Sequence, residues 1–348
     1  MMQDPISSKI CWRKLIQIFC AWTLFCAPVL SAAKTVHQKI KDPTVQTPPL
    51  GKIPRVIAEL SPQTKFAFVV DKALRTLSLW KNAQVPSLFA AYPTDMGRKP
   101  GNKLYRGDYK TPEGIYFFQE TFTQPYLDFS LYGRRAFTMN YPNYFDLLQN
   151  KTGSGIWLHA IPDTQSLNRG SKGCVVVRNN VIEKLKKYIQ LKNTPIVVQD
   201  KVDYIPPKEW SQQNHSLNQW LAEWKKAWES KNLEEYISYY SEDFKSLGMN
   251  KTKWKKYKDE LNSKYKFIRV ELENTDILKH NDQYIFRFQQ KYQSDENQDF
   301  GEKYLYVKSV DGKLKILSEQ WRALPSAKST SEKTPTVLAS GRKKDDPS

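Results

Sequence analysis

The sequence predicts a β-rich domain followed by an α+β domain. Short apolar runs, separated by turns and long loops, occupy residues 61–203. Helical periodicity dominates from residue 211 and gives way after about residue 265 to runs of strand type. A length of 348 residues is sufficient for two domains of ordinary size.

Residues 1–33 have the features of a secretory signal peptide. Basic residues precede an apolar stretch at 15–30, and small residues then offer a cleavage site after Ala33. An uncleaved inner-membrane anchor is the alternative, but the apolar stretch is shorter than the ~20 residues that a span requires. We therefore expect an exported, periplasmic protein.

The remaining chain divides by composition. Residues 34–60, rich in Lys, Thr and Pro, predict an extended leader, and residues 204–210 predict a linker. The two domains are expected at 61–203 and 211–323. The polar segment 324–348 has almost no apolar content, which predicts a disordered tail.

The net charge is +18, and the excess of basic residues lies in the first domain and its leader. Residues 34–207 hold 25 basic and 13 acidic residues, whereas residues 208–323 hold 21 and 19. A basic surface favours an anionic partner. Because export makes nucleic acid an improbable partner, an anionic polymer of the cell envelope fits better.

The first domain is expected to be mostly β-structure with long loops. One helix is predicted at 181–190, where apolar residues recur at helical spacing. The loops within 93–113 and 120–155 are candidates for a lid over a site. Strands are predicted at 66–70, 76–80, 114–119, 136–140, 156–159 and 195–199.

The second domain is predicted to begin with an amphipathic helix, since Leu217, Trp220, Leu221, Trp224 and Trp228 share one helical face. Further helices are expected at 233–240 and 251–265. Four antiparallel strands are expected at 269–278, 283–292, 303–309 and 314–320. We expect the aromatic residues to fill the core of this domain, namely Trp220, Trp224, Trp228, Trp254 and Trp321.

One cysteine and one histidine stand out in the first domain. Cleavage after Ala33 removes three of the four cysteines and leaves Cys174, which cannot form an internal disulfide. His159 is the only histidine between residues 61 and 203. An imidazole can take the proton of a thiol and leave a nucleophilic thiolate. The residues alone leave open the alternative that His159 ends a strand and Cys174 packs in the core.

The local sequence resembles the L,D-transpeptidase catalytic family of YkuD-type peptidoglycan enzymes. The family signature is a His, a gap of about fifteen residues, then Ser or Thr, His, Gly, Cys and an apolar residue. Two upstream blocks, 107–116 and 140–146, resemble family segments too, so that the resemblance spans about 64–200. The matching signature residues are His159, Ser171, Gly173, Cys174 and Val175.

Two positions depart from the family pattern. Lys172 replaces the His before Gly-Cys, and Val176 stands where many members have Arg or Asn. A lone basic residue before Gly-Cys resembles the two-domain cell-shape L,D-carboxypeptidases of helical bacteria. Those proteins also carry a nuclear-transport-factor-two-like (NTF2-like) C-terminal domain, and residues 211–323 resemble that α+β fold in pattern.

The resemblance implies a β-rich L,D-transpeptidase-type catalytic domain and a role for each site residue. Cys174 is expected to be the nucleophile and His159 the base, oriented by the carbonyl of Ala160. Backbone N–H groups at Gly173 and Cys174 are expected to hold the oxyanion. The expected substrate-binding residues are Ser171, Lys172, Arg178, Tyr141 and Asn140.

The implied substrate is the stem tetrapeptide of peptidoglycan, cleaved between meso-diaminopimelate and D-Ala through a thioester. Hydrolysis makes a tripeptide and is favoured, whereas an amine acceptor makes 3–3 cross-links or attaches and releases envelope proteins. A non-catalytic envelope-binding module is the alternative of another class. No metal or cofactor is expected, and the sequence identifies neither a ligand of the second domain nor the oligomeric state.

Overall fold

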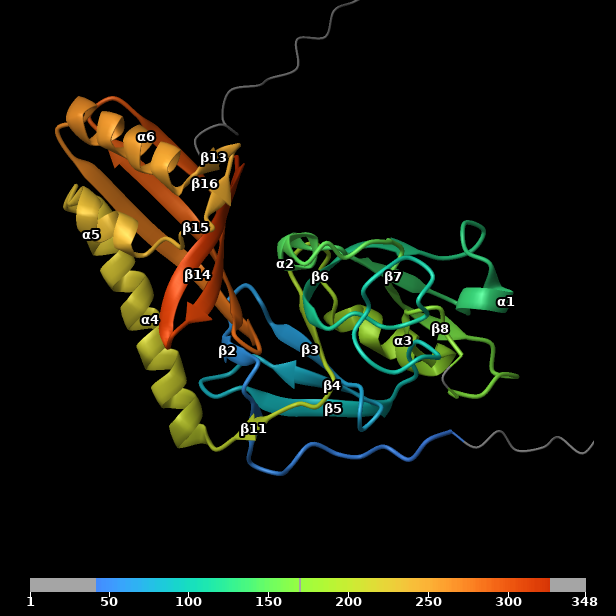
Figure 1. The fold of residues 1–348 in the computed structure, drawn as a ribbon. Helices are drawn as coiled ribbons and strands as arrows, with labels where there is room; N and C mark the ends of the chain where they lie inside the picture. The colour runs from blue at the N-terminus through green and yellow to red at the C-terminus, as the bar shows by residue number, and fades with distance from the viewer. Residues whose placement is uncertain (1–41, 169, 326–348) are drawn as a thin grey trace, which may run out of the picture. The chain divides into compact units, whose positions relative to one another are not determined.

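The computed structural model describes residues 42–168 and 170–325. The expected signal peptide and nearly all of the expected tail lie outside the described residues. No helix in the described ranges is long and apolar enough to cross a membrane. Figure 1 shows two large sheets, one in each half of the described chain.

The first sheet has eight strands in the order β5-β4-β3-β10-β6-β7-β8-β9. Most neighbours are antiparallel, but β3 with β10 and β8 with β9 are parallel. The helix α3 (Asn179–Leu185) follows β9 and packs its apolar face on the sheet. The strands are β3 (Phe66–Asp71), β4 (Thr76–Lys81), β5 (Ser87–Pro93), β6 (Gly114–Phe122), β7 (Ala136–Met139), β8 (Trp157–Ile161), β9 (Val175–Arg178) and β10 (Pro195–Gln199).

All six strands predicted for this domain are confirmed, with ends that differ by only a few residues. The sequence analysis missed β5 and β9. The predicted helix at 181–190 is shorter than expected, because the chain tightens after Leu185 into a 3-10 turn, η1 (Lys186–Tyr188). The β-branched run Val175–Val177 makes up most of β9 and places a strand immediately after Cys174.

Two short helices, α1 (Phe129–Tyr132) and α2 (Tyr144–Leu148), interrupt the loop 120–155. The side chain of Asn143 accepts from the backbone of Asp146, whose carboxylate accepts from the backbone of Asn143. This reciprocal cap fixes the start of α2. Part of the block that resembles the family therefore has a structural function.

The second sheet has five strands in the order β17-β16-β15-β14-β2, and the helices α4, α5 and α6 accompany it (Figure 1). The elements are β2 (Ile57–Glu59), α4 (Pro207–Glu229), α5 (Leu233–Ser238), β12 (Lys245–Ser246), β13 (Met249–Asn250), α6 (Lys251–Lys264), β14 (Ile268–His280), β15 (Gln283–Ser294), β16 (Gln298–Val310) and β17 (Lys313–Ala323). This is the expected set of three helices and four long antiparallel strands, with β2 added at one edge.

The tryptophans of α4 face this sheet, as predicted. The rings of Trp220 and Trp224 lie 5.1 and 6.2 Å from those of two phenylalanines on β15, and Trp228 stacks on Tyr292 of the same strand at 5.7 Å. Trp254 is buried in the same core. The expectation for Trp321 is wrong, because its side chain is 38% exposed near the end of β17.

Parts of the described segments 42–60 and 204–210, expected to be a leader and a linker, form strands and the start of a helix. The short strand β1 (Ile53–Pro54) pairs with β11 (Tyr204–Ile205), and β2 completes the edge of the second sheet beside β14. Pro207 starts α4, because the first turn of a helix tolerates the missing N–H of proline. A chain segment that precedes the first domain therefore belongs to the core of the second.

A buried ion pair within the second sheet also binds residues that lie just before β3 of the first sheet. Arg287 on β15 donates to Asp276 on β14 over 3.0 Å, and the two side chains are only 3% and 1% exposed. Two further donors bind the carboxylate. Asp276 accepts from the backbone N–H of Ser61 at 2.7 Å and from the hydroxyl of Thr64 at 3.1 Å. Removal of one charge leaves the other buried without a counterion.

We predict that Arg287→Met lowers the free energy of unfolding by about 3–5 kcal/mol, because the Asp276 carboxylate then remains charged and buried. Urea unfolding of the full chain measures this change. Lys291→Met is the matched control, since Lys291 lies on the same strand in exposed ion pairs with Glu271 and Glu273 that contribute little. Equal stability of the two variants would contradict the importance of the buried pair.

Candidate active site

The cysteine and the histidine singled out from the sequence lie on one face of neighbouring parallel strands. His159 on β8 stands opposite Val176 on β9, and Cys174 precedes Val176 by two residues. Because side chains alternate along a strand, all three project from the same face. The opposite face belongs to the core and carries Leu158, Ala160, Val175 and Val177.

The turn before Cys174 depends on glycine. Gly173 has φ +133°, and a Cβ at this position would lie 2.7 Å from the carbonyl oxygen of Lys110. The hydroxyl of Ser171 accepts from the N–H of Gly173 at 3.1 Å and donates to the carbonyl of Cys174 at 2.8 Å. Ser171 thus closes the turn that presents the thiol, and its hydroxyl is already occupied.

The orientation of His159 is fixed by a contact with the backbone. Its Nδ1 lies 2.6 Å from the carbonyl oxygen of Ala160. Since a carbonyl can only accept, Nδ1 carries the proton and Nε2 has the free lone pair in the neutral ring. The ring of Tyr132, on α1, packs edge-on against the imidazole at 5.1 Å.

The thiol and the imidazole are both buried, and burial disfavours their charged forms. Burial lowers the pKa of His159 to about 4. It also raises the pKa of the Cys174 thiol to about 11, although the positive charge of Lys103 acts in the opposite direction. In this state the thiol donates to the carbonyl of Gly155 over 3.6 Å, and no hydrogen bond joins it to His159. Both groups are therefore neutral at pH 7.

A cleft of about 640 Å³ opens onto this pair, and its charged lining is mainly basic. Asp95 is the only acidic residue among its described lining residues, and it is neutralised by Arg75 at 2.8 Å. Lys103 is paired with Asp108 at 2.8 Å. Three cationic lining residues have no ion pair within the described part of the chain, namely Arg98, Arg106 and Lys172.

The structure brings some of the predicted site residues to this cleft. His159, Ser171, Lys172 and Cys174 line it, and Gly173 and Ala160 contribute backbone groups beside it. Both loops proposed as lids contribute lining residues. The sequence did not single out several of these, among them Arg98, Lys103, Arg106 and Tyr132, and their position within the candidate loops is the signal that points to them.

Three predicted substrate-binding residues lie outside the cleft lining and have structural partners instead. The amide oxygen of Asn140 accepts from the backbone of Phe117 at 2.7 Å. The hydroxyl of Tyr141 donates to the carbonyl of Thr152 at 3.2 Å. Arg178 is bound to Asp42 and to a backbone carbonyl. The resemblance assigned these residues to the substrate site, but it could not predict the contacts of their side chains.

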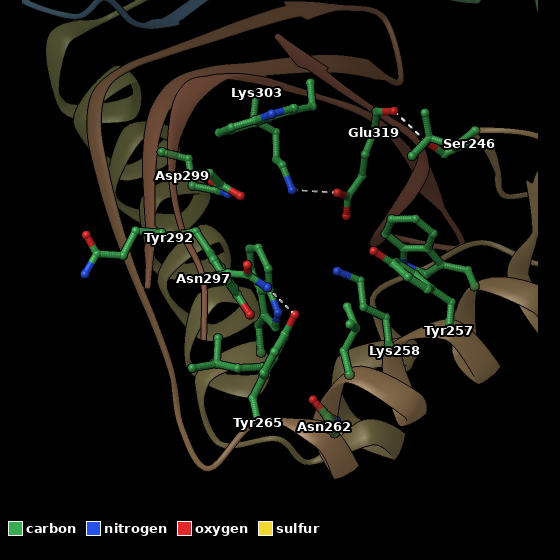
Figure 2. Close-up of a pocket in the computed structure, with 18 residues that line it drawn as sticks. Ser246, Tyr257, Lys258, Asn262, Tyr265, Tyr292, Asn297, Asp299, Lys303 and Glu319 are labelled. Carbon is green, nitrogen blue, oxygen red and sulfur yellow. Dashed lines mark hydrogen bonds and ion pairs between the residues drawn. The ribbon is translucent and has the colours of Figure 1, made fainter. Parts of the chain in front are cut away.

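A second cavity, of about 370 Å³, lies in the C-terminal domain between α6 and the sheet. Figure 2 shows the amino groups of Lys258 and Lys303 directed into it. Lys303 is paired with Glu319 at 2.7 Å. Lys258 is 7% exposed and has no ion pair or hydrogen bond among the described residues.

Aromatic rings take the place of a counterion for Lys258. Its Nζ lies 4.6 Å from the ring centre of Trp228 and 4.7 Å from that of Trp254. Cation–π attraction partly compensates the loss of water. Even so, burial lowers the pKa of Lys258 to about 8. The Oε1 atom of Gln290, also in the cavity lining, has no partner within the described residues.

No group of three or more His, Cys, Asp or Glu side chains suited to a metal ion occurs in the described ranges. The cleft itself offers a thiol, an imidazole, backbone N–H groups and surrounding cations. Such a set can perform nucleophilic acyl transfer.

Comparison with known proteins assigns both domains. The model of the L,D-transpeptidase catalytic domain matches residues 65–198, and the model of the Cds6 C-terminal NTF2-like domain matches residues 216–320. No curated protein matches the chain significantly.

Two solved structures resemble nearly the whole described chain. Bd1075 of Bdellovibrio bacteriovorus is 43% identical, with a TM-score of 0.74 over 79% of this chain and 99% of that one. The helical cell shape determining protein Pgp2 of Campylobacter jejuni is 27% identical, with a TM-score of 0.63 over 77% of this chain and 95% of that one. The chain therefore belongs to the family of peptidoglycan-modifying cysteine enzymes in which an L,D-transpeptidase catalytic domain precedes an NTF2-like domain.

Proposed function

We propose that this protein is a periplasmic L,D-carboxypeptidase that removes D-Ala from stem tetrapeptides of peptidoglycan and thereby remodels the wall and influences cell shape. The observation that supports it is the placement of Cys174 and His159 on one strand face in one basic cleft. The alternative outcome is transpeptidation, which makes 3–3 cross-links or attaches and releases envelope proteins.

The first half-reaction is acylation of the cysteine. Nε2 of His159 takes the thiol proton of Cys174 as Sγ attacks the carbonyl carbon at the L-centre of meso-diaminopimelate. Since the N–H of Gly173 is occupied by Ser171, we assign the backbone N–H of Cys174 as the principal oxyanion donor. One such donor contributes about 3–4 kcal/mol where it has been measured. The tetrahedral intermediate collapses, the C–N bond breaks and D-Ala leaves with the proton from His159.

The second half-reaction determines the product. His159, neutral again, deprotonates a water that attacks the thioester, which releases a tripeptide and returns the proton to Cys174. An amine from another stem peptide would instead form a cross-link. The resemblance to the two-domain cell-shape L,D-carboxypeptidases favours hydrolysis, and the similarity to a helical cell shape determining protein supports the proposed role in cell shape. The cations Arg98, Arg106 and Lys172 give the cleft a field that attracts the carboxylates of stem peptides.

Digestion of purified diaminopimelate-type peptidoglycan distinguishes the outcomes. We expect tetrapeptide muropeptides to become tripeptides, with few 3–3 dimers. If 3–3 dimers predominate, the reaction is transpeptidation and not hydrolysis. If the muropeptides remain unchanged, the protein is not a hydrolase or transpeptidase of these peptides, and the envelope-binding alternative is favoured.

We predict that Cys174→Ala abolishes D-Ala release, because the alanine has no nucleophile. His159→Ala should reduce the rate by about 10²–10⁴-fold, as expected for loss of a general base. The measurement is D-Ala release from a tetrapeptide muropeptide. The matched control is His215→Ala, an exposed histidine of α4, which should keep wild-type activity. Full activity of the Cys174 variant would exclude the mechanism.

The pH profile should show the low pKa of His159. A base with its pKa lowered to about 4 is neutral, and so able to accept a proton, at every pH well above that value. We expect kcat/KM for D-Ala release to be unchanged from pH 7 to pH 5.5 and to fall as the pH passes through about 4. A half-maximal rate near the ordinary histidine value of 6.5 would show that the imidazole is not desolvated in the free enzyme.

We also propose that the cavity of the C-terminal domain holds the protein on the wall by binding a carboxylate of peptidoglycan. The supporting observation is Lys258, a buried ammonium that points into an open cavity and forms no ion pair or hydrogen bond with the described residues. A ligand carboxylate would supply the missing partner, and the cavity tryptophans provide apolar surface for the rest of the ligand.

This second proposal predicts that Lys258→Met weakens binding to purified sacculi at least about 10-fold, roughly the loss of one charge-assisted hydrogen bond. Co-sedimentation with the Cys174→Ala background measures binding without turnover. Lys256→Met is the control, because Lys256 is exposed on the same helix. The same loss in both variants would indicate general charge attraction, and no loss in either would remove the proposed contact.

A further inference from the structure

The loop between β8 and β9 holds the residues that lead to the nucleophile, and several side chains fix its backbone. Arg75 donates to the carbonyl of Leu167 at 2.6 Å, and Asp95 accepts from the N–H of Gly170 at 2.8 Å. Arg178, at the end of β9, donates to the carbonyl of Gln165. These contacts reach the loop only a few residues before Ser171.

Arg178 is itself held by a residue from outside the catalytic domain. Its Nε donates to Asp42 Oδ2 at 2.7 Å, and its Nη2 donates to Asp42 Oδ1. The hydrogen bonds and charge of Arg178 lower the pKa of Asp42 below its usual value. Asp42 also accepts from the N–H of Leu167 at 3.5 Å. The carboxylate therefore bonds to the loop both directly and through Arg178.

The segment that carries Asp42 is attached to the catalytic domain at further points. The hydroxyl of Thr76, on β4, donates to the carbonyl of Gln46 at 3.2 Å, and Pro48 is buried. This segment of the expected leader thus lies along the domain rather than apart from it. Asp42 forms its bidentate contact where the segment meets the loop.

With its guanidinium bound to Asp42 and Gln165, Arg178 has no free edge for a bidentate contact with a substrate carboxylate. It also does not line the cleft. This arrangement differs from the substrate-binding role that the resemblance implies for Arg178.

We propose that Asp42 and Arg178 act together as positioning residues, a clamp by which the segment before the first domain holds the loop that presents Cys174. The proposal rests on the proposed hydrolysis. Without Asp42, Arg178 loses its bidentate partner and the loop loses two of its anchors. Misplacement of a reacting group by about 1 Å can lower a rate about 10²-fold. The clamp therefore acts on turnover, whereas a substrate contact would act on binding.

The test uses Asp42→Ala, Arg178→Ala, the double variant and the charge exchange Asp42→Arg with Arg178→Asp. Each single variant should lower kcat for D-Ala release by about 10- to 100-fold and change KM less than about threefold. Since both remove the same clamp, the double variant should be no worse than Arg178→Ala. The charge exchange should recover part of kcat.

A second measurement does not depend on activity. Trypsin can cleave after Arg169 and Lys172 in the loop, and mass spectrometry identifies these cuts. Both single variants should be cut faster than wild type, and the charge exchange should restore protection. Asp200→Ala, at an exposed position directly after β10, is the control for both measurements.

The results separate the clamp from its alternatives. A raised KM in Arg178→Ala with normal kinetics in Asp42→Ala would overturn the clamp and restore substrate binding. Additive losses, or unchanged cleavage in both single variants, would also overturn it. If wild type releases no D-Ala, the proposed hydrolysis fails, whereas the trypsin measurement still decides whether the clamp exists.

Discussion

The parallel register of β8 and β9 is the constraint on which the site depends. It sets His159 beside Val176 and thus on the same face as Cys174. The alternating residues of the two strands enter the core, namely Leu158, Ala160, Val175 and Val177. A shift of one residue would turn one of these side chains into the core. The same strand supplies the carbonyl of Ala160 that fixes the imidazole. Pairing of the backbone therefore aligns the nucleophile, the base and the group that orients the base.

Burial of this pair has a consequence for its reactivity. Because burial disfavours both charged forms, the thiol and the imidazole are neutral before substrate binds. The thiol then donates to the carbonyl of Gly155, and this contact must give way to one with His159 before attack. A protonated thiol is a poor target for oxidation. This arrangement protects the nucleophile from oxidation until a substrate carbonyl enters the cleft.

Sequence periodicity predicted the elements whose apolar faces are local. The β-branched strands of the first domain and the tryptophan face of α4 are examples, because each element carries its own signal. The scarcity of His and Cys, together with the family resemblance, directed attention to His159 and Cys174 and led to the cleft. The motif spacing could do this because the two residues flank a single loop.

Contacts between distant parts of the chain could not be predicted in this way. The two-residue pairing of β2 with β14 and the contact of Asp42 with Arg178 join segments far apart in sequence, and no local pattern encodes either. The observed contacts of Asn140 and Tyr141 differ from the substrate-binding roles expected for them, and the reason is related. A motif locates a residue in the chain, but the packing around it decides whether its polar atoms bind the backbone or face the cleft.

The most direct test of the central claim is a rapid acid quench of the full chain with a tetrapeptide muropeptide, followed by peptide mass spectrometry. The account predicts that the tryptic peptide with Cys174 gains the mass of the substrate acyl group without D-Ala, as a thioester that hydroxylamine removes. Release of D-Ala without any acyl adduct on Cys174, or with the adduct on another residue, would contradict it.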